Sequence, residues 1–323
     1  MSSHRYTLQP YNGSSTRHTC PSCNKHKQFC RYLDIETLEY LAENVGRCER
    51  ISNCGYHLKP KQYFTDNGIA SESSRIFYKP VSIAKPISYI PVNGFKQSLK
   101  AYDKNHLVTF LTKKFGSIAT NKLIEKYFIG TSNKWSGATI FWQIDLKGKI
   151  RTGKIMLYNP ATGKRVKEPF DHITWVHKQI DNKEYELKQS LYGEQLLHDK
   201  TKPVALVESE KTAIIASAYL PMFIWLAVGN IASLSAAKCR VLAGRKVVLY
   251  PDLNAFDLWS KKAKELSSIT NFSVSDLLER KATTEERLKG LDLADYLINF
   301  DVTEFHKPLH RTRPQSISSE LVK

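Results

Sequence analysis

The segment VALVESEKTAIIAS, residues 204–217, decides the fold of the carboxyl-terminal part of this sequence. It runs from an apolar strand-like stretch through two carboxylates, Glu208 and Glu210, into an apolar stretch of helical character. The same alternation continues down the chain, and we expect helices over 210–219, 233–242 and 255–266 and strands over 222–228, 245–251 and near 272. This order predicts a small parallel sheet with helices on both faces.

Carboxylates stand where the expected strands end. Glu208 ends the first strand and Asp252 ends the third, while Asp292 and Asp295 follow the last one. Side chains beyond the carboxyl ends of neighbouring parallel strands meet at one edge, where ligands bind.

Carboxylates that meet at this edge would need a compensating charge. Like charges at 4 Å repel by roughly 4 kcal/mol at an effective dielectric near 20, and a divalent cation offsets that cost. Oxygen ligands favour Mg²⁺ or Mn²⁺. Glu210 has a second interpretation, as a first-turn helix residue favoured by the helix dipole.

The charge of the chain points to a polyanionic partner. Its 323 residues carry 48 Lys and Arg against 31 Asp and Glu, a formal net charge of +17, and a hydrophobic fraction of 41% is enough for buried cores. Nucleic acid is the first candidate partner, because neutralised phosphates release counterions. Residues 146–167 hold seven cations and no carboxylate, and these are the predicted phosphate-binding residues: Lys147, Lys149, Arg151, Lys154, Lys164, Arg165 and Lys167.

The cysteine spacing predicts a structural zinc site. Cys20 and Cys23 form one close pair, and Cys48 and Cys54 form a second pair 24 residues later. Two such pairs in an intracellular protein are typical of a zinc ribbon with four thiolates in tetrahedral arrangement. The five-residue gap in the second pair is wider than usual, so Cys30 and His57 are alternatives to Cys54. Arginines, lysines and aromatic residues around the pairs suit contacts with single-stranded nucleic acid.

These patterns divide the chain into a zinc ribbon that binds DNA (1–65), a linker (66–105), a basic α+β region (106–200), the parallel-sheet domain (201–300) and a tail (301–323). The amino-terminal segment Met1–Ser15 is polar and lacks the apolar core of a signal peptide, which predicts a cytoplasmic protein. The longest nearly apolar run, 213–228, is too short for a bilayer, so no membrane partner is expected.

The carboxyl-terminal pattern resembles the Toprim domain shared by bacterial primases, topoisomerases and some nucleases. The matching motifs are VESEKTA with Glu208, Gly229-Asn230, PDLNAFD with Asp252, and LDLADYL with Asp292 and Asp295. The resemblance covers about 100 residues and implies a Mg²⁺ or Mn²⁺ set made of Glu208, Asp252, Asn254, Asp292 and Asp295. The sequence departs from the family at Asn254, which replaces the second acid of the motif and brings no charge; Glu210, Asp292 or Asp295 could compensate.

A zinc ribbon, a basic region and a Toprim-like domain in this order resemble the plan of bacterial DnaG-type primases and of phage primase-helicases. The resemblance implies that the chain synthesises short RNA primers on single-stranded DNA, from ribonucleoside triphosphates and beside a separate helicase, with Glu208, Asp252 and Lys211 as catalytic residues. A non-catalytic nucleic-acid-binding replication or regulatory factor and a Toprim nuclease are the two alternatives. A topoisomerase is disfavoured because the chain is too short for a strand-passage gate.

Overall fold

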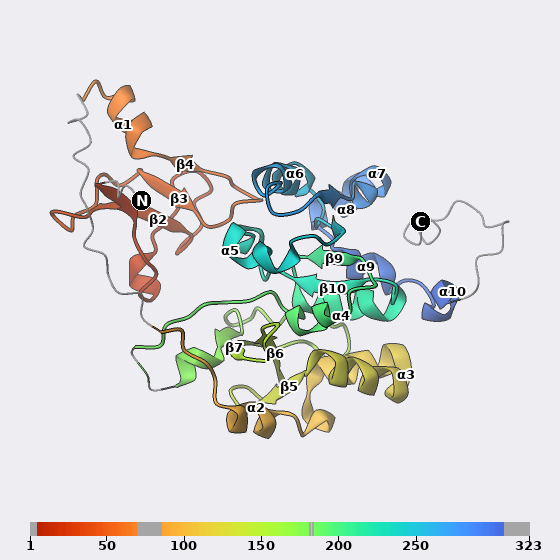
Figure 1. The fold of residues 1–323 in the computed structure, drawn as a ribbon. Helices are drawn as coiled ribbons and strands as arrows, with labels where there is room; N and C mark the ends of the chain where they lie inside the picture. Colours follow the sequence, from red (N-terminus) through yellow and green to blue (C-terminus); the bar gives the residue numbers. More distant parts are fainter. Residues whose placement is uncertain (1–4, 70–85, 181, 183, 307–323) are drawn as a thin grey trace. The chain divides into compact units, whose positions relative to one another are not determined.

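The computed structural model describes residues 5–69, 86–180, 182 and 184–306, and it divides the chain into two compact units, 1–84 and 85–323 (Figure 1). Of the expected linker 66–105, residues 70–85 lie outside the described residues. The remainder from residue 86 belongs to the second unit and contains α2 (Val92–Ser98), so the observed division falls earlier than residue 105. Within the described part of the chain, no helix has the length and hydropathy needed to cross a bilayer.

The first unit is a four-stranded antiparallel sheet in the order β1-β2-β3-β4, as expected for a zinc ribbon. Its elements are β1 (Tyr6–Leu8), η1 (Ser14–Thr16), β2 (Phe29–Asp34), β3 (Gly46–Cys48), β4 (His57–Leu58) and α1 (Pro60–Asp66). The core is thin and consists of Phe29, Cys20 and Cys48. A side chain at Gly46 would lie 2.2 Å from the Cys30 carbonyl oxygen, which explains a glycine there. So small a core needs a further stabilising element.

The second unit begins with an antiparallel sheet, which we call the middle sheet, in the order β5-β6-β7-β8. Its strands are β5 (Gly130–Ser132), β6 (Ala138–Ile144), β7 (Ile150–Met156) and β8 (Ile173–Trp175). One face packs on α3 (His106–Tyr127), whose backbone is broken at Gly116 (φ 78°, ψ 164°). Helix α3 therefore consists of two halves that meet at Gly116. The mixed α+β character predicted for this region is confirmed.

A parallel sheet follows in the order β10-β9-β11-β12. Its strands are β9 (Val204–Val207), β10 (Ile224–Ala227), β11 (Val247–Leu249) and β12 (Phe272–Val274). Alternate residues of β9 enter two different cores, with Ala205 and Val207 on one face and Val204 and Leu206 on the other. Helix α4 (Glu210–Tyr219) covers the first face and α6 (Phe256–Glu265) the second, which confirms the predicted layering (Figure 1).

The remaining helices are short. They are η2 (Tyr102–Lys104), η3 (Val176–Gln179), η4 (Glu194–His198), η5 (Ile231–Ser233), α5 (Ala236–Cys239), η6 (Arg240–Leu242), α7 (Leu277–Lys281), α8 (Thr284–Lys289), α9 (Leu293–Leu297) and α10 (Val302–His306). The helix expected over 233–242 is thus split into three short turns. The two sheets of the second unit share one core, in which the Tyr127 hydroxyl donates to the Trp225 carbonyl at 3.1 Å. This hydrogen bond joins α3, which packs on the middle sheet, to β10 of the parallel sheet.

Candidate active site and metal centre

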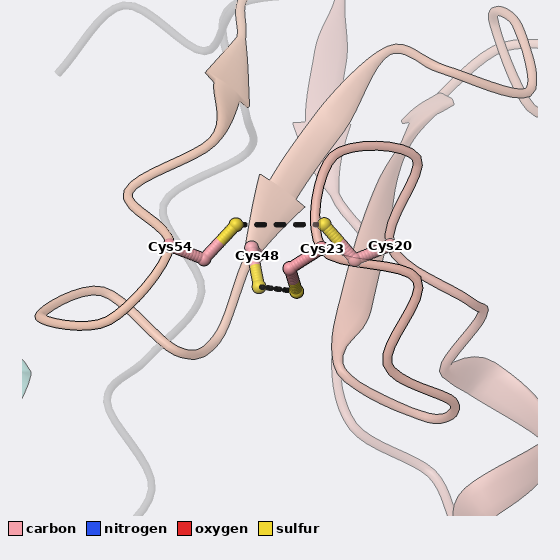
Figure 2. A group of neighbouring side chains, drawn as sticks. All are labelled: Cys20, Cys23, Cys48 and Cys54. Atoms are coloured by element: carbon pink, nitrogen blue, oxygen red, sulfur yellow. Dashed lines mark hydrogen bonds between the residues drawn. The ribbon is translucent and has the colours of Figure 1, made fainter.

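The four cysteines predicted as zinc ligands lie together in the first unit (Figure 2). Their sulfur atoms all lie within 4.8 Å of one another, with 3.7 Å between Cys20 and Cys54 and 4.0 Å between Cys23 and Cys48. Zinc bonds of about 2.3 Å in a tetrahedron place sulfur atoms about 3.8 Å apart. The cluster therefore fits a structural zinc ion in both donor chemistry and spacing.

A tight turn explains how the wide second pair closes on the site. The Arg50 carbonyl accepts hydrogen bonds from the Cys54 and Gly55 amides at 2.8 and 3.3 Å, which folds the chain back on itself. The alternative ligands point elsewhere. The Cys30 thiol donates to the Gln9 carbonyl at 3.2 Å, and His57 Nε2 lies 3.0 Å from the Tyr32 hydroxyl. A hydrogen bond from the Lys25 amide, with help from neighbouring thiols, lowers the pKa of Cys23 to about 6 and favours the thiolate.

Glu208 and Asp252 open into one cavity in the second unit, at the carboxyl edge of the parallel sheet. Strands β9 and β11 are direct neighbours, with Leu206 opposite Leu249, so the residues that follow them emerge side by side. The cavity measures about 910 Å³, and we call it the acidic cavity. Its carboxylates are Glu208, Glu210, Asp252, Asp292 and Asp295. The predicted meeting of Glu208 and Asp252 at one edge therefore occurs.

Asp292 and Asp295 are held by the start of α9. They form a reciprocal capping box, in which each side chain accepts from the other's backbone amide at 3.0 Å. The second oxygen of Asp292 accepts a hydrogen bond of 2.6 Å from the Thr212 hydroxyl on α4. These contacts fix both carboxylates at the cavity wall and tie α9 to the helix that follows Glu208.

Burial and mutual repulsion act together on these acids. Burial raises the pKa of Asp252 well above its ordinary range, and the charges of Asp292, Glu208 and Asp295 raise it further. Burial also raises the pKa of Glu208, although Lys154 and Arg165 oppose this. A cation among the carboxylates would relieve the repulsion, and a lining without cysteine or histidine suits Mg²⁺ or Mn²⁺. Among the described residues, the four cysteines are the one group of His, Cys, Asp and Glu side chains found close enough together to hold a metal ion as they stand.

Cations line the wall that faces the acids. They come from β7, from the segment between β7 and β8, from α4 and from α8, and they are Lys154, Lys164, Arg165, Lys167, Lys211 and Lys289. Lys154 Nζ lies 3.0 Å from Glu210 Oε2, and both side chains are nearly buried. Lys211 Nζ reaches the Gly163 carbonyl at 3.5 Å. The buried Gly163 also packs against the Phe110 ring, which holds the 159–164 turn on the cavity rim.

The seven cations predicted to bind phosphate thus separate into two groups. Lys154, Lys164, Arg165 and Lys167 line the acidic cavity. The other three do not line it: Lys147 and Lys149 belong to the turn between β6 and β7, and Arg151 belongs to β7 itself. Arg151 forms a 2.7 Å ion pair with the buried Asp145 and lies 5.0 Å from the centre of the Tyr89 ring. Arg151 is therefore tied to the middle sheet.

Asn254 does not line the acidic cavity, although it was predicted as a ligand. Its backbone adopts a left-handed conformation with φ 68°, which asparagine tolerates better than most residues. Its side-chain amide donates to the Arg287 carbonyl at 2.7 Å, and its backbone amide donates to Glu279 Oε1 at 2.6 Å. In this conformation Asn254 joins the loop after β11 to α7 and α8.

Strand β7 separates the acidic cavity from a second cavity of about 670 Å³. Lys154 and Met156 face the acidic cavity, whereas Ile155 faces the second one together with Ile140 and Trp142. This second cavity is lined mainly by apolar side chains. The alternation of β7 thus assigns successive residues to two different environments.

Several residues near the acidic cavity carry no signal in the sequence. Thr212 lies in the apolar helix α4 and Lys289 at the end of α8, and neither residue belongs to a recognisable motif. Lys238 lies in α5 behind Gly229, where burial lowers its pKa to about 8 while the Glu210 carboxylate opposes the shift. Only the fold brings these side chains close to Glu208 and Glu210, so the spacing of residues along the chain could not reveal them.

Two family models match this sequence. A family model described as a zinc beta-ribbon finger matches residues 4–69, and a domain of unknown function, DUF6371, matches residues 105–253. No curated protein matches the sequence.

Solved structures similar to this chain include primases at low identity. The primase fragment of the bacteriophage T7 primase-helicase protein is 12% identical with a TM-score of 0.38, and the match covers 88% of this chain and 97% of that one. The E. coli primase catalytic core is 17% identical with a TM-score of 0.31, covering 65% and 77%. The Aquifex aeolicus primase, with its zinc-binding and RNA polymerase domains, is 13% identical with a TM-score of 0.33, covering 91% and 80%.

Proposed function

We propose that this protein is a primase-type nucleotidyltransferase, which synthesises short RNA primers on single-stranded DNA in the replication of a plasmid, phage or mobile element. One observation carries the proposal: carboxylates that follow neighbouring strands and cations from β7 and the segment after it line the same cavity of about 910 Å³. A volume of this order accommodates a nucleotide. The order of zinc ribbon, basic sheet and Toprim-like motifs supports the same activity.

The carboxylates would hold Mg²⁺ or Mn²⁺ in this proposal. Glu208, Asp252, Asp292 and Asp295 supply the oxygen donors, and the bound ion would stabilise charge on the attacking and leaving oxygens of nucleotidyl transfer. Asn254 is left out of this set because its side-chain amide donates to the Arg287 carbonyl. Glu210 is left out because its carboxylate pairs with Lys154.

The cations of the acidic cavity would bind the phosphates of the nucleotide and of the growing primer. Lys164, Arg165 and Lys167 are exposed, so they can reach a polyanion without breaking buried contacts. Lys211, the second residue of α4, lines the same cavity as these three cations. Its ammonium group lies 3.5 Å from the Gly163 carbonyl. Lys154 lies deeper and is oriented by Glu210, which holds its ammonium group beside Glu208.

The first unit would bind template DNA once zinc has ordered it. Its surface combines arginines with aromatic rings: Arg31 lies 5.5 Å from the centre of the Tyr40 ring and Arg17 lies 5.1 Å from that of Tyr11. Such pairs suit phosphates and stacked bases of a single strand. The partners in this proposal are single-stranded DNA, ribonucleoside triphosphates and a separate helicase, with no membrane.

Incorporation of labelled ribonucleotides on a single-stranded template tests the proposal. With Mg²⁺ or Mn²⁺ present, the wild-type chain should yield short products, and Asp252→Asn should abolish them. Asp257→Asn is the matched control, because Asp257 is an exposed acid of α6 outside the cavity lining, and it should keep activity. Equal product from wild type and Asp252→Asn would overturn the assignment.

A second candidate is a non-catalytic single-strand-binding factor, which is favoured by the position of Asn254 outside the cavity. Such a factor would bind single strands equally well with and without divalent metal and would give no product in the same assay. Metal-dependent cleavage of the template without incorporation would instead indicate a Toprim nuclease. The assay therefore separates all three functions.

A further inference from the structure

Residues 167–171 form a small loop that presents an aromatic ring to solvent. The loop is closed at its base, where the His172 amide donates to the Val166 carbonyl at 3.4 Å and His172 Nδ1 lies 3.3 Å from the same oxygen. Val166 is itself bonded to Leu157, next to the end of β7. The loop is therefore anchored to the middle sheet.

Three rings are arranged in series at this loop. The Phe170 ring stacks on the imidazole of His172, with centroids 4.3 Å apart and planes 22° apart. The edge of His172 in turn meets Trp135, at 5.2 Å and 75°. Phe170 is 54% exposed, more than any other phenylalanine in the ranges described. One face of the phenyl ring is covered by His172 and much of the rest is exposed. The ring therefore offers an apolar surface on which a planar group can stack.

Three cations precede this ring in the chain and line the acidic cavity. Lys167 begins the loop and lines the cavity, as do Lys164 and Arg165 before it. None of these three pairs with a carboxylate within 4 Å among the described residues. The loop itself also contains Glu168 and Asp171, so its own contribution to binding a polyanion would come from the ring rather than from net charge.

We propose that Phe170, backed by His172 and Trp135, is a stacking platform for a base of single-stranded nucleic acid. The phosphates beside that base would be bound by Lys164, Arg165 and Lys167 at the rim of the acidic cavity. Binding of single strands without sequence preference has two components. Cations bind the phosphates along the nucleic-acid backbone, and an aromatic ring stacks on a base. This inference rests on the proposed function only in assuming a nucleic-acid partner, and it does not require catalysis.

The test measures binding of the full-length zinc-loaded chain to a fluorescent single-stranded DNA oligonucleotide by anisotropy. Phe170→Ala should weaken binding about fivefold or more, and Phe170→Trp should restore it, because stacking needs a ring and not a particular residue. Leu288→Ala is the matched control, since Leu288 is 85% exposed on α8, and its affinity should equal that of the wild type. Quenching of 2-aminopurine in the oligonucleotide should fall in Phe170→Ala and return in Phe170→Trp.

Three comparisons decide the outcome. Duplex DNA of the same length should show no effect of Phe170→Ala, because its bases are already stacked and paired. Unchanged single-strand affinity in Phe170→Ala, or weakened binding of ATP alone, would overturn the platform. Loss of primer synthesis is a separate readout: a chain that makes no primers but shows the Phe170 effect would keep the platform and refute the proposed function.

Discussion

Lys154 Nζ on β7 and Glu210 Oε2 at the first position of α4 lie 3.0 Å apart, and they join the middle sheet to the parallel-sheet domain. The exposed fractions of the two side chains are 12% and 2%. A carboxylate so deeply buried needs its partner, and the contact fixes the positions of both side chains. The alternative interpretation of Glu210 as a first-turn helix residue is compatible with this contact.

Breaking this pair should destabilise the second unit. Lys154→Met leaves the Glu210 carboxylate buried without its main partner, and we expect the free energy of unfolding to fall by about 3–5 kcal/mol. Urea denaturation followed by tryptophan fluorescence measures it. The double variant Lys154→Met with Glu210→Gln should recover part of the loss. Equal stability of Lys154→Met and the wild type would show that the pair does not matter.

Removing zinc should unfold the first unit and leave the second intact. Structural zinc contributes on the order of 10 kcal/mol to folding a small ribbon. All five tryptophans lie between residues 135 and 259, so their fluorescence should not change when a chelator makes residues 5–69 sensitive to protease. Metal analysis should find one zinc per chain in wild type and in Cys30→Ser, and none in Cys54→Ser. Retention of zinc by Cys54→Ser would refute the four-cysteine assignment.

Restoring an acid at Asn254 should not create a better metal site. Asn254→Asp removes the donor to the Arg287 carbonyl, and we expect a loss of about 1–2 kcal/mol in the free energy of unfolding. Mn²⁺ affinity, measured by calorimetry, should stay as in the wild type. Asn254→Gly serves as control because it keeps the left-handed conformation and adds no charge. A gain in Mn²⁺ affinity in Asn254→Asp would return this residue to the ligand set.

The two groups of cations should differ in how they respond to salt. Each phosphate contact with a single strand contributes about 0.7 to the slope of log affinity against log salt. Replacing Lys164, Arg165 and Lys167 together by alanine should therefore reduce the slope by about 2. Lys147→Ala with Lys149→Ala should leave it unchanged, because these two lie at the β6–β7 turn outside the cavity. The opposite result would place the nucleic acid on that turn.

Lys126 should make stability depend on pH above neutrality. Burial, with a smaller effect of Lys202, lowers its pKa to about 8 from 10.5. The unfolded chain then binds more protons between pH 8 and 10.5, so stability rises with pH in this window. From pH 8 to 9 the wild type should gain up to about 1 kcal/mol relative to Lys126→Met, since one proton corresponds to 1.4 kcal/mol per pH unit. Parallel stability curves for the two proteins would exclude this effect.

The regular parts of the structure could be predicted from the sequence because their cause is local. Alternating strand-like and helix-like stretches fix a parallel order, and that order places Glu208 and Asp252 after neighbouring strands. The cysteine pairs are equally local, apart from the turn at Arg50 that brings Cys54 into place. In both cases the short-range sequence pattern and the general rules of sheet topology are sufficient to predict which residues come together.

The remaining features depend on contacts between distant residues. Glu210 meets Lys154 across 56 positions of sequence, and Asn254 is held by residues 25 and 33 positions away. The seven cations fall into two groups because of the way the middle sheet packs in the second unit. The composition of the sequence does not contain this information. Phe170 lies in a loop whose sequence shows no periodicity, so only its stacking on His172 distinguishes it.

The alternation along β7 has a consequence for how this chain can vary. Since Lys154 and Met156 face one cavity and Ile155 faces the other, inserting or deleting one residue within the strand would exchange the two linings and bury an ammonium group among hydrocarbons. A change of length inside β7 should therefore prevent the second unit from folding, even where the substituted residues are chemically similar.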